Sequence, residues 1–322
     1  MKRFSALTVL GICVLTLVGF SLFANASAAS FPEKTITIIC HSSPGSPVDV
    51  LSRQLAAGAN KIPGLTVVVE TKTGGSGAVA MAYLLTQQAD GHTIYAMTRS
   101  NADLFAGGKI KNFKWDDLDY FLRIQADPYI IAASPSAPFK TAKEMIEYAK
   151  KNPGAVKMGG YGSGSAHHFM GLTFAQKAGI EITWVPYPGG SDAIMAVLGG
   201  HIPVVHSNPG VLIKHFEAGK LVPLAVSVAE RIKALPNTPT YKELGIDMDE
   251  SHFRGLAAKK GVPEDRIKVL HDIFKKVMES PEFIDYTVTN DMIPSYLNTK
   301  DFNKSFGETV NENIEIQKKL GM

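Results

Sequence analysis

The sequence predicts an α/β fold built from two α/β units. From Thr35 to Val226, short runs of β-branched and apolar residues alternate with segments of helical periodicity. Glycine- and serine-rich loops join several of these runs to the helical segment that follows. Such alternation implies parallel sheets covered on both faces by helices. From Pro263 onward the pattern becomes mainly helical, and we expect this tail to fold back on the first unit.

Local signals justify the individual elements. Thr141 and Glu144 form a capping box that opens one helix, and Gly179 closes another. Strands are expected at 35–40, 66–69, 92–97, 130–133, 156–158, 182–185, 202–205, 222–226 and, alone in the last third, 253–257. Helices are expected at 48–60, 79–87, 142–150, 167–178, 192–198, 211–218, 263–279 (with Pro263 in the first helical position) and 300–319.

The first 28 residues have the pattern of a secretory signal peptide. Lys2 and Arg3 precede an uncharged apolar run, and Ala26-Ser27-Ala28 fits the Ala-x-Ala rule for signal peptidase. An uncleaved membrane anchor is the alternative, because the run is nearly long enough to span a bilayer. With cleavage after Ala28, we expect a periplasmic protein that begins at Ala29.

Composition excludes several classes of partner and site. The chain has 33 Lys and Arg against 30 Asp and Glu, without a basic block, so nucleic acid is not expected to bind. Of its two cysteines, Cys13 lies in the predicted signal peptide. The mature chain would keep only Cys40, which allows neither an internal disulfide nor a cysteine-based metal cluster.

Three loops rich in glycine and serine each separate a predicted strand from a predicted helix, at 42–47, 73–77 and 159–165. In an open α/β sheet, ligands bind beyond the carboxyl ends of the strands. Helix N-termini at this edge present unpaired N–H groups and a partial positive charge, which favour anions. One such loop alone is more often a tight turn. Three at the same topological position predict an anion site.

Rival chemistries find less support. The segment 75–80 has a Gly-x-Gly-x-x-Ala pattern, but Thr98-Arg99 stands where a dinucleotide site needs an acidic residue. His167-His168 could suggest a metal, yet neighbouring helical residues point in different directions, and a capping or core role is the alternative. No Gly-x-Ser-x-Gly elbow, phosphate loop or nucleophile–base–acid set occurs. We therefore expect no cofactor, no metal and no catalytic residues.

Several short segments occur in an order typical of one protein family. They include a Pro-Gly-Ser-Pro-Val-Asp turn, a Gly-Ser-Gly-Ser-Ala-His-His loop and a Val-Pro-Tyr-Pro-Gly-Gly turn, and lie at 31–36, 44–49, 69–77, 90–93, 161–168, 184–190, 198–200, 218–221 and 236–240. In this order they resemble the solute-binding proteins of tripartite tricarboxylate transporters, the Bug/TctC-like periplasmic receptors. The resemblance covers nearly the whole mature chain.

This resemblance implies a type-II periplasmic binding protein, with two α/β lobes around a central cleft. We expect residues 29–127 and 251–322 to form lobe 1 and residues 128–250 to form lobe 2. The family captures small organic carboxylates, including di- and tricarboxylates and aromatic acids, and delivers them to two membrane permease components. We expect a monomer that binds without catalysis. A ligand-sensing subunit for a membrane kinase, or an exported α/β enzyme, are the alternatives.

The chain departs from the family pattern around the expected cleft, and these departures put a ligand inferred from relatives in doubt. His41-Ser42 replace Pro-Phe, Ser46 replaces a glycine, Pro203 and Ser207 stand where Asp often occurs, and Phe253 stands where Trp is common.

The expected ligand contacts come from the three loops, from the wall of the second lobe and from two arginines. They are Ser43, Gly45, Ser46, Gly75, Ser76, Arg99, Ser163, Gly164, Ser165, His168, Tyr187, Ser207, Asn208 and Arg254. Arg99 or Arg254 could grip a second carboxylate in a bidentate fork, with Arg254 preferred. Alternatively, both arginines are solvated or paired with nearby Asp residues. Because Ser207 replaces a possible acceptor for an ammonium group, we expect a ligand with one or two carboxylates and no amine.

Overall fold

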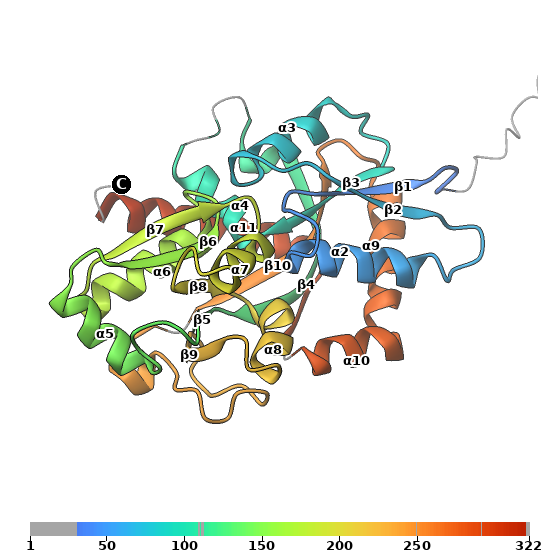
Figure 1. The fold of residues 1–322 in the computed structure, drawn as a ribbon. Helices are drawn as coiled ribbons and strands as arrows, with labels where there is room; N and C mark the ends of the chain where they lie inside the picture. The colour runs from blue at the N-terminus through green and yellow to red at the C-terminus, as the bar shows by residue number, and fades with distance from the viewer. Residues whose placement is uncertain (1–30, 109, 111–112, 249, 291, 320–322) are drawn as a thin grey trace, which may run out of the picture. The chain divides into compact units, whose positions relative to one another are not determined.

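The computed structural model of the chain describes residues 31–319, except 109, 111–112, 249 and 291 (Figure 1). The predicted signal peptide, 1–28, lies outside the described residues. All features discussed below belong to the unit that begins at Lys34. None of the helices in the described part of the chain combines the length and the apolar character needed to cross a bilayer.

The first sheet has six strands in the order β11-β4-β10-β3-β1-β2. Strand β1 pairs in parallel with both β2 and β3, whereas β10 runs antiparallel to β3 and β4, and β11 runs antiparallel to β4. The bounds are β1 Ile36–Cys40, β2 Val67–Thr71, β3 Thr93–Thr98, β4 Leu118–Pro128, β10 Ser251–Lys259 and β11 Pro294–Leu297.

The second sheet has five strands in the order β7-β6-β8-β5-β9. Strand β6 is parallel to β7 and β8, and β5 is antiparallel to β8 and β9. The bounds are β5 Ile130–Ala133, β6 Val156–Tyr161, β7 Ile182–Tyr187, β8 Val204–Ser207 and β9 Val222–Val226. Both sheets are therefore mixed, and the expectation of parallel sheets is wrong. The reason is that β5 and β10, which follow the two passages between the sheets, run against their neighbours.

The helices begin and end close to most of the expected positions. Their bounds are α2 Pro47–Ala59, α3 Ala78–Thr86, α4 Arg99–Ala106, α5 Ala142–Lys151, α6 Ala166–Ala178, α7 Gly190–Leu198, α8 Pro209–Glu217, α9 Glu264–Met278, α10 Pro281–Thr289 and α11 Thr299–Lys319, with 3-10 turns η1 Gly75–Gly77, η2 Trp115–Asp117 and η3 Lys242–Leu244. The capping box of Thr141 and Glu144 is present, and Gly179 ends α6 in the left-handed conformation. Pro263 caps α9 rather than occupying its first position.

The sequence analysis missed four elements: β4, β11, α4 and α10. Strand β4 is the longest strand described, with 11 residues, and is buried over most of its length. Its apolar residues are interrupted by Asp119, Arg123 and Asp127, which conceal the pattern of a strand. Partners from distant elements compensate these charges: Lys260 pairs with Asp119 at 2.8 Å, and Arg123 lies 5.1 Å from the centre of the Phe253 ring.

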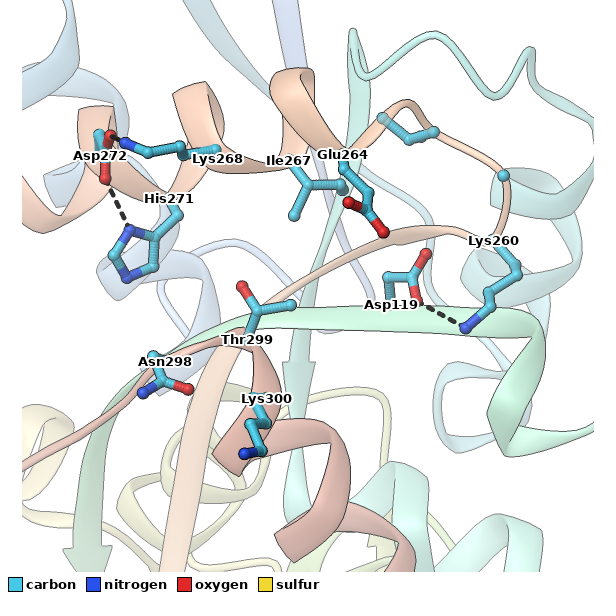
Figure 2. Close-up of a pocket in the computed structure, with 12 residues that line it drawn as sticks. Asp119, Lys260, Glu264, Ile267, Lys268, His271, Asp272, Asn298, Thr299 and Lys300 are labelled. Carbon is cyan, nitrogen blue, oxygen red and sulfur yellow. Dashed lines mark hydrogen bonds and ion pairs between the residues drawn. The ribbon is translucent and has the colours of Figure 1, made fainter.

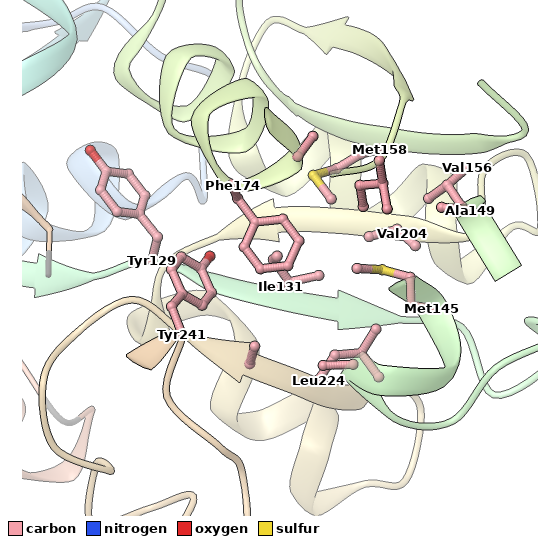
Figure 3. Packing of buried hydrophobic residues seen from close by; sticks show 14 of the residues in the cluster. Tyr129, Ile131, Met145, Ala149, Val156, Met158, Phe174, Val204, Leu224 and Tyr241 are labelled. Carbon is pink, nitrogen blue, oxygen red and sulfur yellow. The ribbon is translucent and has the colours of Figure 1, made fainter. Parts of the chain in front are cut away.

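Helices cover both faces of the five-stranded sheet. Alternate residues of β5 divide between two cores, since Ile131 packs with residues of α5 and α6, and Ile130 packs with residues of α7 and α8. In the first of these cores, Phe174 of α6 and Tyr241 lie against Ile131 (Figure 3). The centres of the two aromatic rings are 4.8 Å apart.

The C-terminal helices cover the six-stranded sheet. Phe302 and Phe306 of α11 are fully buried, and Phe306 stacks on Tyr120 of β4 at 4.0 Å. Helices α9 and α2 pack on each other and against the same sheet. Thus the first and last parts of the described chain share one core. Cys40, the single cysteine among the described residues, lies fully buried at the end of β1, and burial raises the pKa of its thiol to about 12.

Candidate functional site

A small cavity lies where N-terminal ends of five helices meet. Its lining includes Pro47, the first residue of α2; Gly190, the first residue of α7; and His167, the second residue of α6. Thr98 directly precedes α4, and Ser207 lies two residues before α8. Each of these helices brings unpaired N–H groups and a partial positive charge to its N-terminal end. The arrangement therefore favours an anion.

The cavity has a volume of about 20 Å³, which is room for about one water molecule. The residues that line it are His41, Ser42, Pro47, Val48, Thr98, Tyr161, His167, Gly190, Ser207, His252 and Arg254. Among these described lining residues, Arg254 is the one permanent cation and none is acidic. A negative group placed here would meet no opposing carboxylate in the first layer of contacts.

Loops from the two sheets touch each other beside the cavity. The Ser46 and Ser191 hydroxyls lie 3.0 Å apart, and Ser191 Oγ also donates to the Pro44 carbonyl at 3.2 Å. Ser76 Oγ donates to the Ser163 carbonyl at 2.8 Å. These hydrogen bonds join the loop before α2 to α7, and the loop after β2 to the loop after β6. The structure thus has its binding loops in a closed arrangement.

Two glycines allow this close approach. A Cβ on Gly189 would lie 2.2 Å from Ser46 Oγ, and one on Gly162 would lie 2.1 Å from Ser76 Oγ. Both distances are far below a normal contact. Gly162 also has a φ of +36°, which a residue with a side chain rarely adopts. The loops can therefore touch only because these positions carry no side chain.

Arg254 occupies the centre of a buried polar network. Its side chain is 1% exposed and forms an ion pair with Asp127, which is fully buried. Asp127 also accepts hydrogen bonds from Gln125 Nε2 at 2.9 and 3.0 Å. Arg254 Nη2 donates to Asn208 Oδ1 at 2.7 Å. Burial lowers the pKa of Arg254 to about 10, so the guanidinium keeps its charge at neutral pH.

Four histidines are buried around the same cavity. Burial lowers the pKa of His41 and of His206 to about 3 and that of His167 to about 4, and it lowers the pKa of His252 well below its usual value. All four are therefore neutral at pH 7. Tyrosines surround them: Tyr161 OH lies 2.7 Å from His41 Nδ1, and Tyr129 OH lies 3.0 Å from His252 Nδ1. No group of three or more potential metal ligands occurs in the described ranges.

The sequence matches that of a known receptor family. The model of the tripartite tricarboxylate transporter family receptor matches residues 51–322. The chain belongs to this family. A Cupriavidus necator protein, described as the UPF0065 protein in the gbd 5' region, is 33% identical over 302 residues, which cover 93% of this chain and 91% of that protein.

Solved structures share the fold. One described as a periplasmic transporter is 27% identical, has a TM-score of 0.86 and covers 90% of this chain and 98% of its own. An R. palustris protein, solved with adipate, is 23% identical, has a TM-score of 0.83 and covers the same shares of the two chains. These matches establish a receptor with the two-lobed architecture of periplasmic binding proteins and give no support to the sensor or enzyme alternatives.

The receptor brings part of the predicted site together. Ser207 and Arg254 line the cavity, and Ser46, Ser76 and Ser163 make the contacts between its closing loops. The remaining predicted residues do not line the cavity. They are Ser43, Gly45, Gly75, Arg99, Gly164, Ser165, His168, Tyr187 and Asn208, of which Asn208 bonds directly to Arg254.

Two of the predicted side chains form hydrogen bonds with backbone groups of their own segment. Ser165 Oγ caps α6 by accepting from the His168 N–H at 3.2 Å, and His168 Nδ1 accepts from the Gly164 N–H at 3.1 Å. Arg99 turns toward Glu250, with which it forms an ion pair. Arg254 thus pairs with an Asp, as the alternative interpretation had it, whereas the partner of Arg99 is a glutamate.

The predicted contacts omitted most of the lining, above all Thr98, Tyr161 and His252, and His41 was noted only as a departure from the family pattern. A usable signal existed, since each stands in or directly beside a strand and within two residues of a predicted contact. His167 was considered only as a metal ligand, a cap or a core residue. Its place in the cavity follows from its position in the first turn of α6.

A second pocket of the receptor, of about 780 Å³, lies beside α9 (Figure 2). It includes Asp119 near the start of β4, whereas Asp127 lies eight residues further along that strand, about 26 Å away at the usual rise. Most of its charges pair with one another: Lys260 with Asp119, and Asp272 with both Lys268 and His271. These paired groups are already compensated and offer an incoming ion little.

Proposed function

We propose that the receptor captures a small organic carboxylate in the cavity at the helix N-termini. The observation that supports this most is the lining itself, which combines five helix N-termini and a buried arginine with no acidic side chain among its described residues. The anion would replace water around these donors. Charge-assisted hydrogen bonds each contribute about 1.5–3 kcal/mol, so three or four of them would suffice for micromolar affinity after the cost of association. The relative solved with adipate also fits a carboxylate ligand.

Binding would couple to closure of two lobes, 29–127 with 251–322 and 128–250. In support, the strands of the six-stranded sheet fall within the first set, except for Pro128 at the end of β4, and every strand of the five-stranded sheet falls within the second. The chain passes between the sheets at Tyr129 and again before Ser251. These two passages lie side by side, because Ser227 bonds to Tyr129 and to the Glu250 carbonyl. Rotation at 125–129 and 250–255 would open the cavity.

The receptor would act in the periplasm as a monomer and without a chemical step, delivering its ligand to the membrane permease components of the transporter. The signal-peptide pattern of residues 1–28 supports export. Protein recovered from the native periplasm should begin at Ala29 or within about three residues of it. N-terminal sequencing that finds Met1 in the mature protein would contradict this location.

Ligand binding can be tested on protein purified without refolding. Mass spectrometry of released small molecules should find a carboxylic acid. In thermal-shift and calorimetric titrations, at least one of acetate, succinate, adipate and citrate should stabilise the protein, and uncharged succinamide should not. Glutamate and aspartate should bind more weakly than the best acid without an amine, because an ammonium group would meet no carboxylate in the cavity. Failure of every acid to bind would refute the proposal.

A further inference from the structure

The orientation of the Asn208 side chain fixes the proton position on His167. Asn208 Nδ2 donates to the Pro128 carbonyl at 2.8 Å. The other amide atom lies 2.7 Å from Arg254 Nη2, and it must be the oxygen because a guanidinium can only donate. His167 Nε2 lies 2.9 Å from the same oxygen. A carbonyl oxygen cannot donate, so His167 must carry its proton on Nε2.

It follows that Nδ1 of His167 is an acceptor. A neutral imidazole has one protonated nitrogen, and burial keeps His167 neutral at pH 7. Nδ1 is buried, and no described residue lies within hydrogen-bonding reach of it. The His167 side chain as a whole is only 6% exposed. His167, which lines the cavity, therefore carries a buried lone pair that needs a hydrogen-bond donor.

Two further polar atoms of the lining residues also lack partners in the described chain. Nε of Arg254 is a cationic donor, and Ser207 Oγ is a hydroxyl that can donate or accept. Ser207 Oγ lies against the first turn of α7, since a Cβ on Gly190 would come within 2.9 Å of it. Arg254 and His167 are joined through Asn208. One cavity thus combines an unsatisfied acceptor with two groups that can donate to an anion.

A ligand that matches these atoms carries a hydroxyl group next to a carboxylate. The hydroxyl would donate to His167 Nδ1, while the carboxylate would accept from Arg254 and Ser207. An amino group could also donate, but its charge would be buried without a counter-ion, because no described lining residue is acidic. The cavity holds only about 20 Å³ in the closed arrangement. The ligand must therefore be short, and the loops joined by the contacts Ser46–Ser191 and Ser76–Ser163 must move apart to admit it.

We propose that the receptor is selective for a short hydroxydicarboxylate, whose hydroxyl is recognised by His167 and whose adjacent carboxylate is held by Arg254 and Ser207. The second carboxylate would lie toward the N-termini of α2 and α7. This inference rests on the proposed function, because it specifies the carboxylate that the same cavity takes. It distinguishes ligands that differ by a single oxygen atom.

Malate and succinate make the decisive pair, since they differ only in the hydroxyl. Calorimetric titration of the wild-type receptor at pH 7.5 should show one enantiomer of malate binding about ten- to a hundredfold more tightly than succinate. In His167→Phe, which keeps a ring but removes both nitrogens, the preference for malate should fall to about twofold or less. His201→Gln changes an exposed histidine after α7 and should keep the wild-type preference.

A spectroscopic measurement makes the test independent of any variant. The ¹⁵N resonance of His167 Nδ1 should report hydrogen bonding when malate binds and should stay unbonded with succinate. If His167→Phe fails to fold, this signal and the wild-type preference decide.

Equal or tighter binding of succinate, or of aspartate, would overturn the inference and leave the proposed function intact. Failure of all these acids to bind would overturn both.

Discussion

The outer pocket beside α9 has a volume of about 780 Å³, and most of its charged groups form ion pairs with one another. The inner cavity has a volume of about 20 Å³, and its polar groups are buried. Lys268 and Asp272 of the outer pocket have side chains that are 76% and 52% exposed, whereas Arg254 of the inner cavity is 1% exposed. The comparison shows that unsatisfied buried donors, rather than a large pocket volume, mark the place where a ligand gains the most binding free energy.

Acidification should affect the inner region most strongly. An unfolded histidine has a pKa near 6.5. The folded-state values of His41, His167 and His206 are about 3 to 4, so between these limits the unfolded chain binds more protons. Stability should therefore fall as pH decreases below 6.5, by about 1.4 kcal/mol per pH unit for each buried histidine. His252 shifts in the same direction.

Asp103 opposes this trend, because burial raises the pKa of its carboxyl to about 7. Its contribution to folding stability therefore grows as pH falls from 7 toward 3.8 and offsets the effect of about one of the four histidines. The net loss of folding stability is then about 4 kcal/mol per pH unit. Urea unfolding at pH 7.5, 6.5, 5.5 and 4.5 would measure this dependence of the free energy of unfolding on pH. A flat profile between 6.5 and 4.5 would show that the histidines are not buried as described.

Removal of the Arg254 guanidinium should have the next largest effect. Arg254→Leu leaves Asp127 buried without its partner, which should cost about 3–5 kcal/mol of folding stability. Asp127→Leu should cost a similar amount. The double variant Arg254→Leu/Asp127→Leu should recover much of the stability, since neither charge remains unpaired. Dicarboxylate binding should stay lost in the double variant. If calorimetry instead finds wild-type affinity, Arg254 does not contact the ligand.

The contact between loops can be tested at Gly189. Its φ of −155° is extended and suits any residue, so Gly189→Ala should leave folding stability nearly unchanged. The new Cβ would instead collide with Ser46 Oγ and keep the loops apart, and ligand affinity should fall about tenfold or more. Ser46→Gly in the same protein should restore part of the affinity by removing the shorter collision, while the one with Ser43 Cβ at 2.9 Å remains. Unaltered calorimetric binding in Gly189→Ala would mean that ligand capture does not need these loops to touch.

The outer pocket supplies the smallest expected effect. Lys268→Gln with Asp272→Asn removes an exposed ion pair, which should change folding stability by less than about 0.5 kcal/mol. Malate and succinate affinities should match those of the wild type within error. A clear loss of binding in this variant would mean that the ligand binds in the outer pocket and not in the inner cavity.

Elements with local signals could be predicted from the sequence. The helix α5 has its capping box at Thr141 and Glu144, and α2 has Pro47 in its first turn, so both were found within about two residues of their bounds. Strand β4 could not be found in this way, because its charged residues are compensated by Lys260, Phe253 and Arg254, more than a hundred positions away. The directions of β5 and β10 likewise depend on pairing between distant segments.

The same distinction holds for the site. Glycine- and serine-rich loops at strand ends are visible in the sequence, and three of their serines make contacts beside the cavity, Ser46 with Ser191 and Ser76 with Ser163. The histidine cluster is not visible, since it depends on register: β10 pairs with β3 so that Arg254 lies opposite Thr98. That pairing brings residue 252 near residues 41 and 167, which the sequence separates widely.

The buried thiol of Cys40 has a practical consequence for following the receptor in solution. With a pKa of about 12, roughly one thiol in thirty thousand is ionised at pH 7.5, so maleimide dyes should leave it unmodified. A cysteine introduced by Met195→Cys, on α7 at a side chain that is 64% exposed, would then be the one reactive thiol among the described residues. An environment-sensitive fluorophore at that position would turn ligand capture into an optical signal, without any change to the residues that line the cavity.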